Sequence, residues 1–313
     1  WHGHPGNRWS DAFGERAGAR DSEAKLRNLG VRSLPVTPDT LPNHQPLIRS
    51  GRTAPLPAWY PTWARELADL YFSGTTCVFL LHGNVHDFIR CSDDTEGNND
   101  SYATLGEFLA SQVFGLWDIV LQYDLGRGLR AAAGNKPQRL QAMMQHLSAR
   151  LGEAGTWPRD PESVLLLADR FLERNLLETD PAQRKSIGLI FEYAQHLVPA
   201  ADLNMLGRGP GTNLVRFLGW AQNPYIKRVN IAFCLITDKL SELNARLVQN
   251  PHVAAIEIPL PDKTERERFA RWSSRSRTLA QMTDFTPEQL AEMSNGLSLV
   301  NLNVLLSQAA QTD

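Results

Sequence analysis

The 313-residue sequence lacks long apolar runs, a targeting signal and an excess of charge of either sign. No stretch approaches the roughly 20 continuous apolar residues that a helix needs to cross a bilayer, and no charged segment followed by an apolar one resembles a signal peptide. The formal net charge is −2, so overall charge gives no reason to expect nucleic acid or a membrane as a partner. We therefore expect a cytoplasmic protein.

Cysteine is also scarce, and the chain has only Cys77, Cys91 and Cys234. These three show no spacing typical of a metal site, and an odd number fits a reducing compartment better than a disulfide framework. Cys77 and Cys234 fall within apolar runs and are expected to be small core residues. His82, His86 and Asp87 fall on an expected strand and its turn, where both histidines would not face one ion, so we predict no metal site.

Residues 1–57 differ in composition from the rest of the chain. The first thirty are rich in Gly, Arg and small polar residues without apolar periodicity, and seven prolines lie between Pro35 and Pro61. Such segments stay extended and bury little surface. We expect a flexible tail followed by a semi-rigid linker.

From residue 58 onwards, short apolar runs alternate with segments that have helix start signals. Runs of this length are typical of strands covered on both faces, and they occupy residues 77–83, 118–124, 186–194, 229–238 and 253–260. Helix starts are indicated at Thr104, Asp160 and Thr286. The alternation predicts an α/β fold with a five-stranded parallel sheet at residues 58–261, and a small helical lid at 262–313.

Three stretches resemble the AAA+ ATPase family. IAFCLITDKLSELNARLVQNPHVAAIEIPLPDKTERERFARW (231–272) is similar to the family's fourth strand, sensor region, fifth strand and entry to the lid, and AEMSNGLSLVNLNVLLSQAA (291–310) is similar to its last lid helices. SIGLIFEYAQHLVP (186–199) lies where the family's acidic Walker B strand would be. The resemblance covers about residues 60–313. It implies a P-loop-NTPase-like core with a lid, a nucleotide site at the strand tips, and ring assembly with copies of itself or with an active AAA+ module.

The residues expected at such a nucleotide site are mostly missing. The sequence contains no GxxxxGK[ST], and Gly83 is followed by Asn84 without a lysine or hydroxyl residue. GRGPGTN (207–213) lacks lysine and is expected to be a surface loop. The acidic strand ends in Glu192, with Tyr193 at the water-activating position, while Thr237 matches the polar sensor position. We therefore predict no catalytic residue and name as candidate cofactor-binding residues Gly83, Asn84, Glu192 and Thr237; whether ATP or ADP with Mg²⁺ binds them stays open.

These observations favour a degenerate AAA+ module, the first of a tandem protein, that scaffolds or regulates a ring while another module hydrolyses ATP. Two alternatives stay open: an ATPase with a non-standard pocket formed by Asn84, Glu192 and Thr237, and a non-enzymatic adaptor that binds partners through its proline-rich tail and its lid. The lid carries an arginine cluster, which we expect to be a solvated helix face: Arg266, Arg268, Arg271, Arg275 and Arg277. The segment 123–128 does not support a substrate-threading loop, because its one aromatic residue lies at the strand end.

Overall fold

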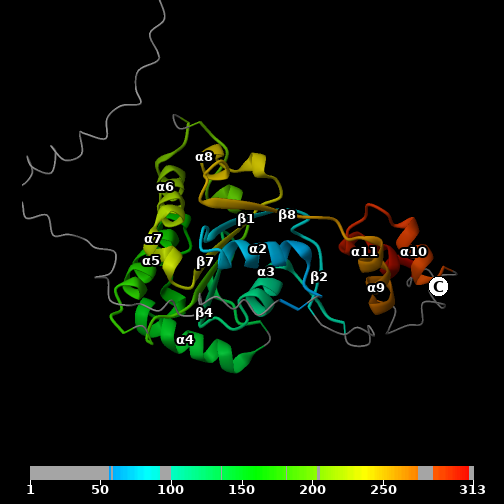
Figure 1. Ribbon diagram of the computed structural model, residues 1–313, viewed down its shortest axis with the longest axis horizontal. Coiled ribbons are helices and arrows are strands. Elements are labelled where there is room, and N and C mark those ends of the chain that lie inside the picture. The colour runs from blue at the N-terminus through cyan, green and yellow to red at the C-terminus, as the bar shows by residue number, and fades with distance from the viewer. Residues whose placement is uncertain are drawn as a thin grey trace, which may run out of the picture. The chain divides into compact units, whose positions relative to one another are not determined.

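The computed structural model describes residues 56–57, 59–91, 100–134, 136–180, 182–202, 205–273 and 285–309. Most of the predicted tail and linker therefore lies outside the described residues, as do Arg275 and Arg277. Strands and helices alternate along the chain (Figure 1). The strands are β1 Val78–Gly83, β2 Ile89–Arg90, β3 Tyr102–Ala103, β4 Ile119–Asp124, β5 Gly128–Ala131, β6 Ile187–Phe191, β7 Ile231–Ile236 and β8 Val253–Ile258.

The helices differ widely in length. The longer ones are α2 Thr62–Phe72, α4 Pro137–Leu151, α5 Pro161–Leu176, α6 Arg208–Gln222, α9 Lys263–Ser273 and α11 Leu299–Ala309, and the shorter ones are α3 Leu105–Phe108, α7 Pro224–Arg228, α8 Ala245–Val248 and α10 Pro287–Met293. A π-helical turn, Leu109–Val113, continues α3. Within the described part of the chain, no helix is both long and apolar enough to cross a membrane.

The main sheet has six strands in the order β5-β4-β6-β7-β1-β8. The five strands predicted from the sequence are all present and pair in parallel, which confirms the α/β fold class. The sixth strand, β5, pairs antiparallel to β4 at one edge. Sequence analysis missed β5 because its four residues, GLRA, carry no apolar run.

Burial of the central strands explains why they could be predicted from apolar runs in the sequence. Every residue of β4, β6 and β7 is buried, whereas β8, at the opposite edge of the sheet from β5, alternates between buried and exposed positions. Helix α6 packs on this core through Trp220, whose ring stacks on Phe233 at a centroid distance of 4.8 Å. Cys77 and Cys234 are both buried in the core, which confirms their predicted role.

The predicted helix starts are confirmed, and one predicted loop is wrong. Thr104 and Thr286 each form a capping box, and the Asp160 side chain accepts a hydrogen bond from Ser163 N. The segment 207–213 is not a surface loop, because α6 begins at Arg208. Pro210 lies in the first turn of this helix, where an N–H group has no intrahelical partner and its loss costs little.

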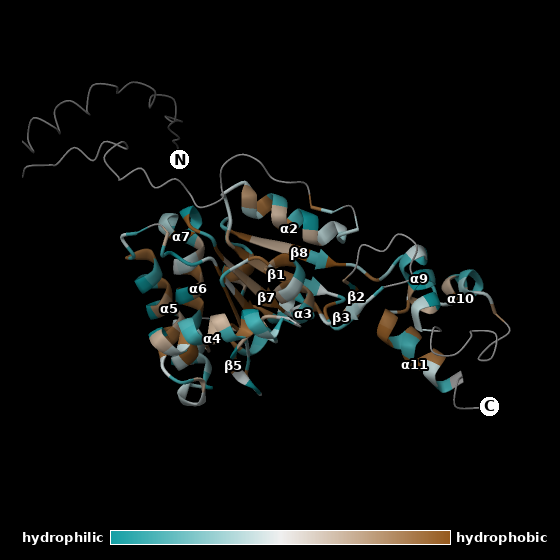
Figure 2. Cartoon of the chain, turned by 90° about the horizontal axis from the view of Figure 1, so that it is seen from below, coloured by the Kyte–Doolittle hydropathy of each residue, from teal (hydrophilic) through white to brown (hydrophobic). Residues whose placement is uncertain are grey.

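Helices α9, α10 and α11 form the lid, with a small hydrophobic core of their own. Its buried members are Phe269, Leu299, Leu302 and Leu306, and α11 is brown along much of its length in the hydropathy view (Figure 2). The predicted solvated arginine face is wrong for Arg266, which is only 4% exposed and donates to the backbone oxygens of Pro261 and Ala291. The expected i,i+4 pairing is present between Arg271 and Glu267.

Candidate nucleotide-binding site

Four backbone N–H groups at the end of β1 and in the β1 loop, residues 84–88, bond to acceptors within the protein. Asn84 N donates to Ile258 O at 2.8 Å, and Gly83 N donates to Asp238 O at 3.1 Å. Two further amides bond to acceptors within residues 83–88, those of Val85 and Phe88. A phosphate cradle at a strand tip depends on free N–H groups. These four amides are engaged elsewhere.

Gly83 has a structural reason to be glycine. Its φ is +95°, and an added Cβ would lie 2.7 Å from Ile258 O. A side chain here would both adopt a disfavoured backbone conformation and collide with β8. The glycine that ends β1 is therefore required by its close approach to the neighbouring strand.

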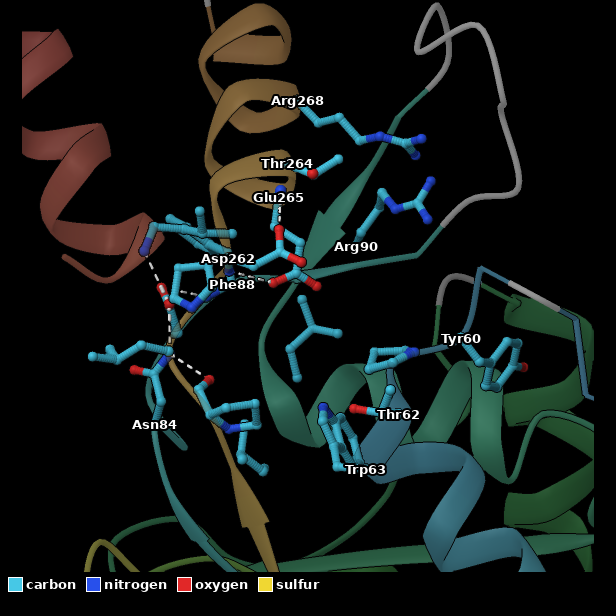
Figure 3. A pocket seen from close by; sticks show the side chains of 18 of the residues that line it. Tyr60, Thr62, Trp63, Asn84, Phe88, Arg90, Asp262, Thr264, Glu265 and Arg268 are labelled. Atoms are coloured by element: carbon cyan, nitrogen blue, oxygen red, sulfur yellow. Dashed lines mark hydrogen bonds between the residues drawn. The ribbon is translucent and has the colours of Figure 1, made fainter. Parts of the chain in front are cut away.

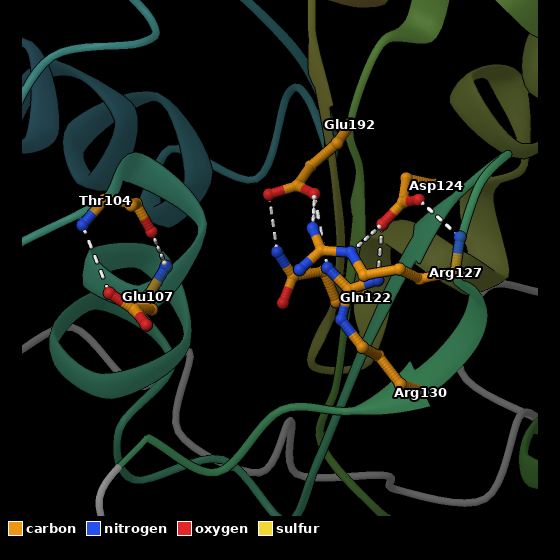
Figure 4. Close-up of polar contacts among 7 residues, drawn as sticks. All are labelled: Thr104, Glu107, Gln122, Asp124, Arg127, Arg130 and Glu192. Carbon is orange, nitrogen blue, oxygen red and sulfur yellow. Dashed lines mark hydrogen bonds and ion pairs between the residues drawn. The ribbon is translucent and has the colours of Figure 1, made fainter.

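The next helix along the chain, α3, closes its own N-terminus. Thr104 N donates to Glu107 Oε2 at 3.2 Å, and Glu107 N donates to Thr104 Oγ1 at 3.4 Å (Figure 4). Gly106 brings this helix start against two side chains, since an added Cβ would lie 2.4 Å from Gln122 Nε2 and 2.6 Å from Glu192 Oε1. The amides of Glu107 and Phe108 at this helix start thus already have acceptors on Thr104.

Glu192 belongs to a network of charged and polar side chains at the ends of β4 and β6, drawn in Figure 4. Its Oε1 accepts from Gln122 Nε2 at 2.6 Å. Its Oε2 accepts from Arg127 at 2.9 Å and from Arg130 at 3.2 Å. The same two guanidinium groups donate to Asp124 Oδ2, at 2.8 Å and 2.6 Å. We call Gln122, Asp124, Arg127, Arg130 and Glu192 the carboxylate–arginine network.

The charges of this network balance one another. Burial alone would raise the pKa of Asp124, but hydrogen bonds from Arg127 N and from both guanidinium groups bring that pKa below its ordinary value. The hydrogen bond to Asp124 in turn raises the pKa of Arg127. Both arginines already have carboxylate partners, and both oxygens of Glu192 are engaged. The network offers neither a free counter-charge for phosphate nor an open carboxylate for Mg²⁺.

Thr237 and Tyr193 lie at the tips of the neighbouring strands. Thr237 is 1% exposed, and its hydroxyl lies 3.3 Å from Gln195 Oε1. Tyr193 has a φ of 55°, in the left-handed region, and its ring lies 5.7 Å from that of His86. His86 Nε2 lies 2.7 Å from Asp238 Oδ1. A strained residue at this position is a feature common at functional sites.

The predicted cofactor-binding residues are divided between two cavities. Glu192 and Thr237 line the sheet-edge cavity of about 380 Å³, together with the arginines of the network. Asn84 lines the lid-side cavity of about 500 Å³. Figure 3 shows the walls of this second cavity coming from α2, the β1 loop and α9, with side chains that include Trp63, Arg90, Glu265 and Arg268. Gly83 is not among the residues that line either cavity.

Across the ranges that the structure describes, no three His, Cys, Asp or Glu residues are arranged to hold a metal ion. Burial raises the pKa of Glu265 in the lid-side cavity, where its carboxylate accepts a hydrogen bond from Asp262 N. This glutamate acts in a capping box that starts α9.

A largely parallel sheet with polar residues at its strand ends and a separate helical unit places the chain among the P-loop-type α/β proteins. Two family models match it: the AAA+ chaperone N-terminal Rossmann-like domain over residues 54–259, and the AAA+ chaperone second helical domain over residues 264–313. The chain therefore belongs to the AAA+ chaperone family, which confirms the resemblance seen in the sequence. A comparison with curated proteins gave no match.

Glu192 was predicted from the sequence as a site residue, but its partners were not. Gln122 and Asp124 are buried polar residues in the strand IVLQYD, which is otherwise mostly apolar. A buried polar side chain on a central strand requires a hydrogen-bonding partner. This signal could have led to Arg127 and Arg130, which follow closely in the chain.

Proposed function

We propose that this chain is a degenerate AAA+ module that scaffolds or regulates a ring, while another AAA+ module supplies ATP hydrolysis. AAA+ family members commonly oligomerise, and the chain has the α/β core and the lid of that family. The observation that carries the proposal is the β1 loop, in which the amides of Asn84, Val85 and Phe88 bond to acceptors within the protein instead of standing free for phosphate.

The electrostatics of the β1 loop support the same proposal. Asp87, in that loop, is a carboxylate with 5% of its surface exposed, so a triphosphate placed here would meet a negative charge in a poorly screened environment. The arginines nearest to Glu192 are already paired with carboxylates. Binding a phosphate beside Glu192 would require breaking the contacts between these arginines and their carboxylates, and this raises the free energy of the phosphate-bound state.

We further propose that the chain is divided into a tail and linker at 1–57, a core at 58–261 and a lid at 262–313. The bounds of the two family matches support the last division, as do the separate hydrophobic clusters of core and lid. A cytoplasmic location is part of the proposal. It is supported by the scarcity and odd number of cysteines, three in 313 residues, which fit a reducing compartment better than a disulfide framework.

ATP binding and turnover by residues 1–313 test this proposal. We expect no Mg²⁺-dependent turnover, and we expect the sedimentation coefficient of the assembled chain to stay the same when ATP is added. A catalytically active AAA+ protein measured in parallel serves as the positive control. Micromolar affinity for ATP together with Mg²⁺-dependent turnover would overturn the proposal.

One observation favours the second candidate, an ATPase with a non-standard pocket. The sheet-edge cavity, at about 380 Å³, has the size of a small-molecule site and is lined by Glu192 and Thr237. If this candidate is correct, Glu192→Gln abolishes turnover, whereas Glu257→Gln, at an exposed position on the edge strand β8, leaves it unchanged. Equal activity of the two variants would exclude Glu192 from the reaction.

A further inference from the structure

The side chain of Asp87 joins the β1 loop to the last helix of the lid. Its Oδ2 accepts from Leu299 N at 2.9 Å, and its Oδ1 accepts from Val300 N at 2.8 Å. These are the first two residues of α11 and lie more than 200 positions further along the chain. Amides at a helix start have no partners within the helix, and the helix dipole favours a negative charge there. Asp87 thus caps α11 from a distant part of the sequence.

The start of α11 has little remaining capacity for another anion. The next amide, Asn301 N, donates to Ser298 Oγ at 3.2 Å, and Leu302 N donates to Ser298 O at 3.0 Å. With the two amides held by Asp87, the first four N–H groups of the helix all have acceptors. The internal carboxylate and Ser298 fill the place that a bound anion would take.

The opposite side of Asp87 is fixed to the sheet. Asn84 Nδ2 donates to Asp87 Oδ2 at 2.7 Å, and Asn84 N bonds to Ile258 O at the end of β8. A continuous set of hydrogen bonds therefore runs from β8 through Asn84 and Asp87 to α11. Because Asp87 is only 5% exposed, water competes weakly for these bonds.

Aromatic contacts surround this polar connection. Phe88 stacks on Phe269 of α9 at a centroid distance of 5.9 Å, and Tyr102 lies edge-on to Phe269 at 5.0 Å. Tyr102 also lies 4.8 Å from the ring of Trp272. Phe88 of the β1 loop and Tyr102 of β3 thus pack against the small core of the lid. The polar contacts of Asp87 reach α11, and the aromatic contacts of Phe88 and Tyr102 reach α9.

We propose that Asp87 is an internal anion that holds the lid on the core in a single arrangement, independently of nucleotide. A carboxylate that is part of the same chain has a high effective concentration at the helix start. The lid therefore takes its position on the core without a bound ligand. This inference goes beyond the proposed function, because it applies whether or not the module enters a ring.

Hydrogen exchange of the α11 amides tests the proposal with the full chain. In the parent protein we expect equal protection of residues 299–309 with and without Mg²⁺ and ATP. In Asp87→Ala, the exchange of the Leu299 and Val300 amides should accelerate at least about tenfold, because each loses a charge-assisted hydrogen bond. Glu292→Gln, which removes an exposed lid charge paired with Lys263, is the matched control and should change nothing in α11. Unchanged protection in Asp87→Ala would overturn the proposal.

A distance measurement tests the lid arrangement directly. Spin labels at Leu116→Cys in the core and Ser307→Cys in the lid occupy exposed positions, in a chain carrying Cys91→Ser. We expect one narrow distance distribution in the parent, with or without ATP, and a broad one in Asp87→Ala. If that variant does not fold, Asp87→Asn, which keeps one carbonyl acceptor, should give an intermediate width. We call the proposed link from Asp87 to α11 the tether. A broad distance distribution in the parent, or a shift of that distribution on addition of ATP, refutes the tether.

The outcomes separate this inference from the proposed function. A chain that hydrolyses ATP while its lid distance stays narrow and constant refutes the degenerate-module proposal and leaves the tether standing. A chain that is inert towards ATP but has a broadly distributed lid refutes the tether alone. Turnover and distance are measured on the same preparation.

Discussion

Replacing Arg130 by methionine probes the carboxylate–arginine network most directly. Methionine keeps an unbranched side chain of similar reach but removes the guanidinium group that bridges Asp124, at 2.6 Å, and Glu192, at 3.2 Å. The side chains of these carboxylates are 7% and 17% exposed, so water replaces the lost contacts only in part. We therefore expect a measurable loss of folding stability from this single change.

The size of the loss in folding stability depends on the contacts that the two carboxylates keep after the change. Each charge-assisted hydrogen bond contributes about 1.5–3 kcal/mol, and a carboxylate left wholly unpaired costs about 3–5 kcal/mol. Arg127 still contacts both carboxylates after the change, which reduces the cost. We expect the free energy of unfolding to fall by about 2 kcal/mol at pH 7.

The same variant has a defined pH dependence. The pKa of Asp124 lies below its ordinary value of 3.8 in the folded protein. Its stabilising contribution is therefore complete above the unfolded pKa and is lost as the pH falls through the folded pKa. Without Arg130 the folded pKa moves back towards 3.8. The stability of Arg130→Met should then fall less steeply than that of the parent between about pH 5 and pH 3.

Urea unfolding at several pH values measures both effects. Lys263→Met is the matched control, because Lys263 and Glu292 form an ion pair whose side chains are 54% and 76% exposed. An exposed pair of this kind contributes about 0–1 kcal/mol. If Arg130→Met lowers the free energy of unfolding no more than Lys263→Met does, the carboxylate–arginine network does not stabilise the fold. The same conclusion follows if the stability of Arg130→Met falls with decreasing pH as steeply as that of the parent.

Two further pairs of substitutions test packing and backbone strain. Gly106→Ala should destabilise the fold by about 1–3 kcal/mol, because its Cβ would lie 2.4 Å from Gln122 Nε2. Gly219→Ala in α6, where a Cβ meets nothing within 4 Å, should instead stabilise by about 0.5–1 kcal/mol; equal effects of the two in urea unfolding would contradict this account. Tyr193→Gly should be more stable than Tyr193→Ala by about 1 kcal/mol, since both remove the ring but only glycine relieves the φ of 55°. A thermal unfolding scan in which the alanine variant is the more stable would refute the strain.

Much of the fold could be predicted from local patterns because those patterns have local causes. A strand buried on both faces must be apolar throughout, so β4, β6 and β7 were readable as continuous runs. Capping boxes at Thr104 and Thr286 involve residues only three positions apart. β5 was missed, since four residues at a sheet edge carry no such pattern, and the 207–213 segment was misread because its glycines suggested a loop.

Local sequence patterns were sufficient to predict the family and the central parallel sheet, and the sequence has no lysine directly after Gly83. The partners of the polar side chains are seen only in the folded structure: Glu192 pairs with Arg130, and Asp87 with the start of α11. The physical reason is distance along the chain. Hydrophobic periodicity and helix caps act over a few residues, whereas a buried charge needs a partner wherever the fold brings one, even 212 residues away.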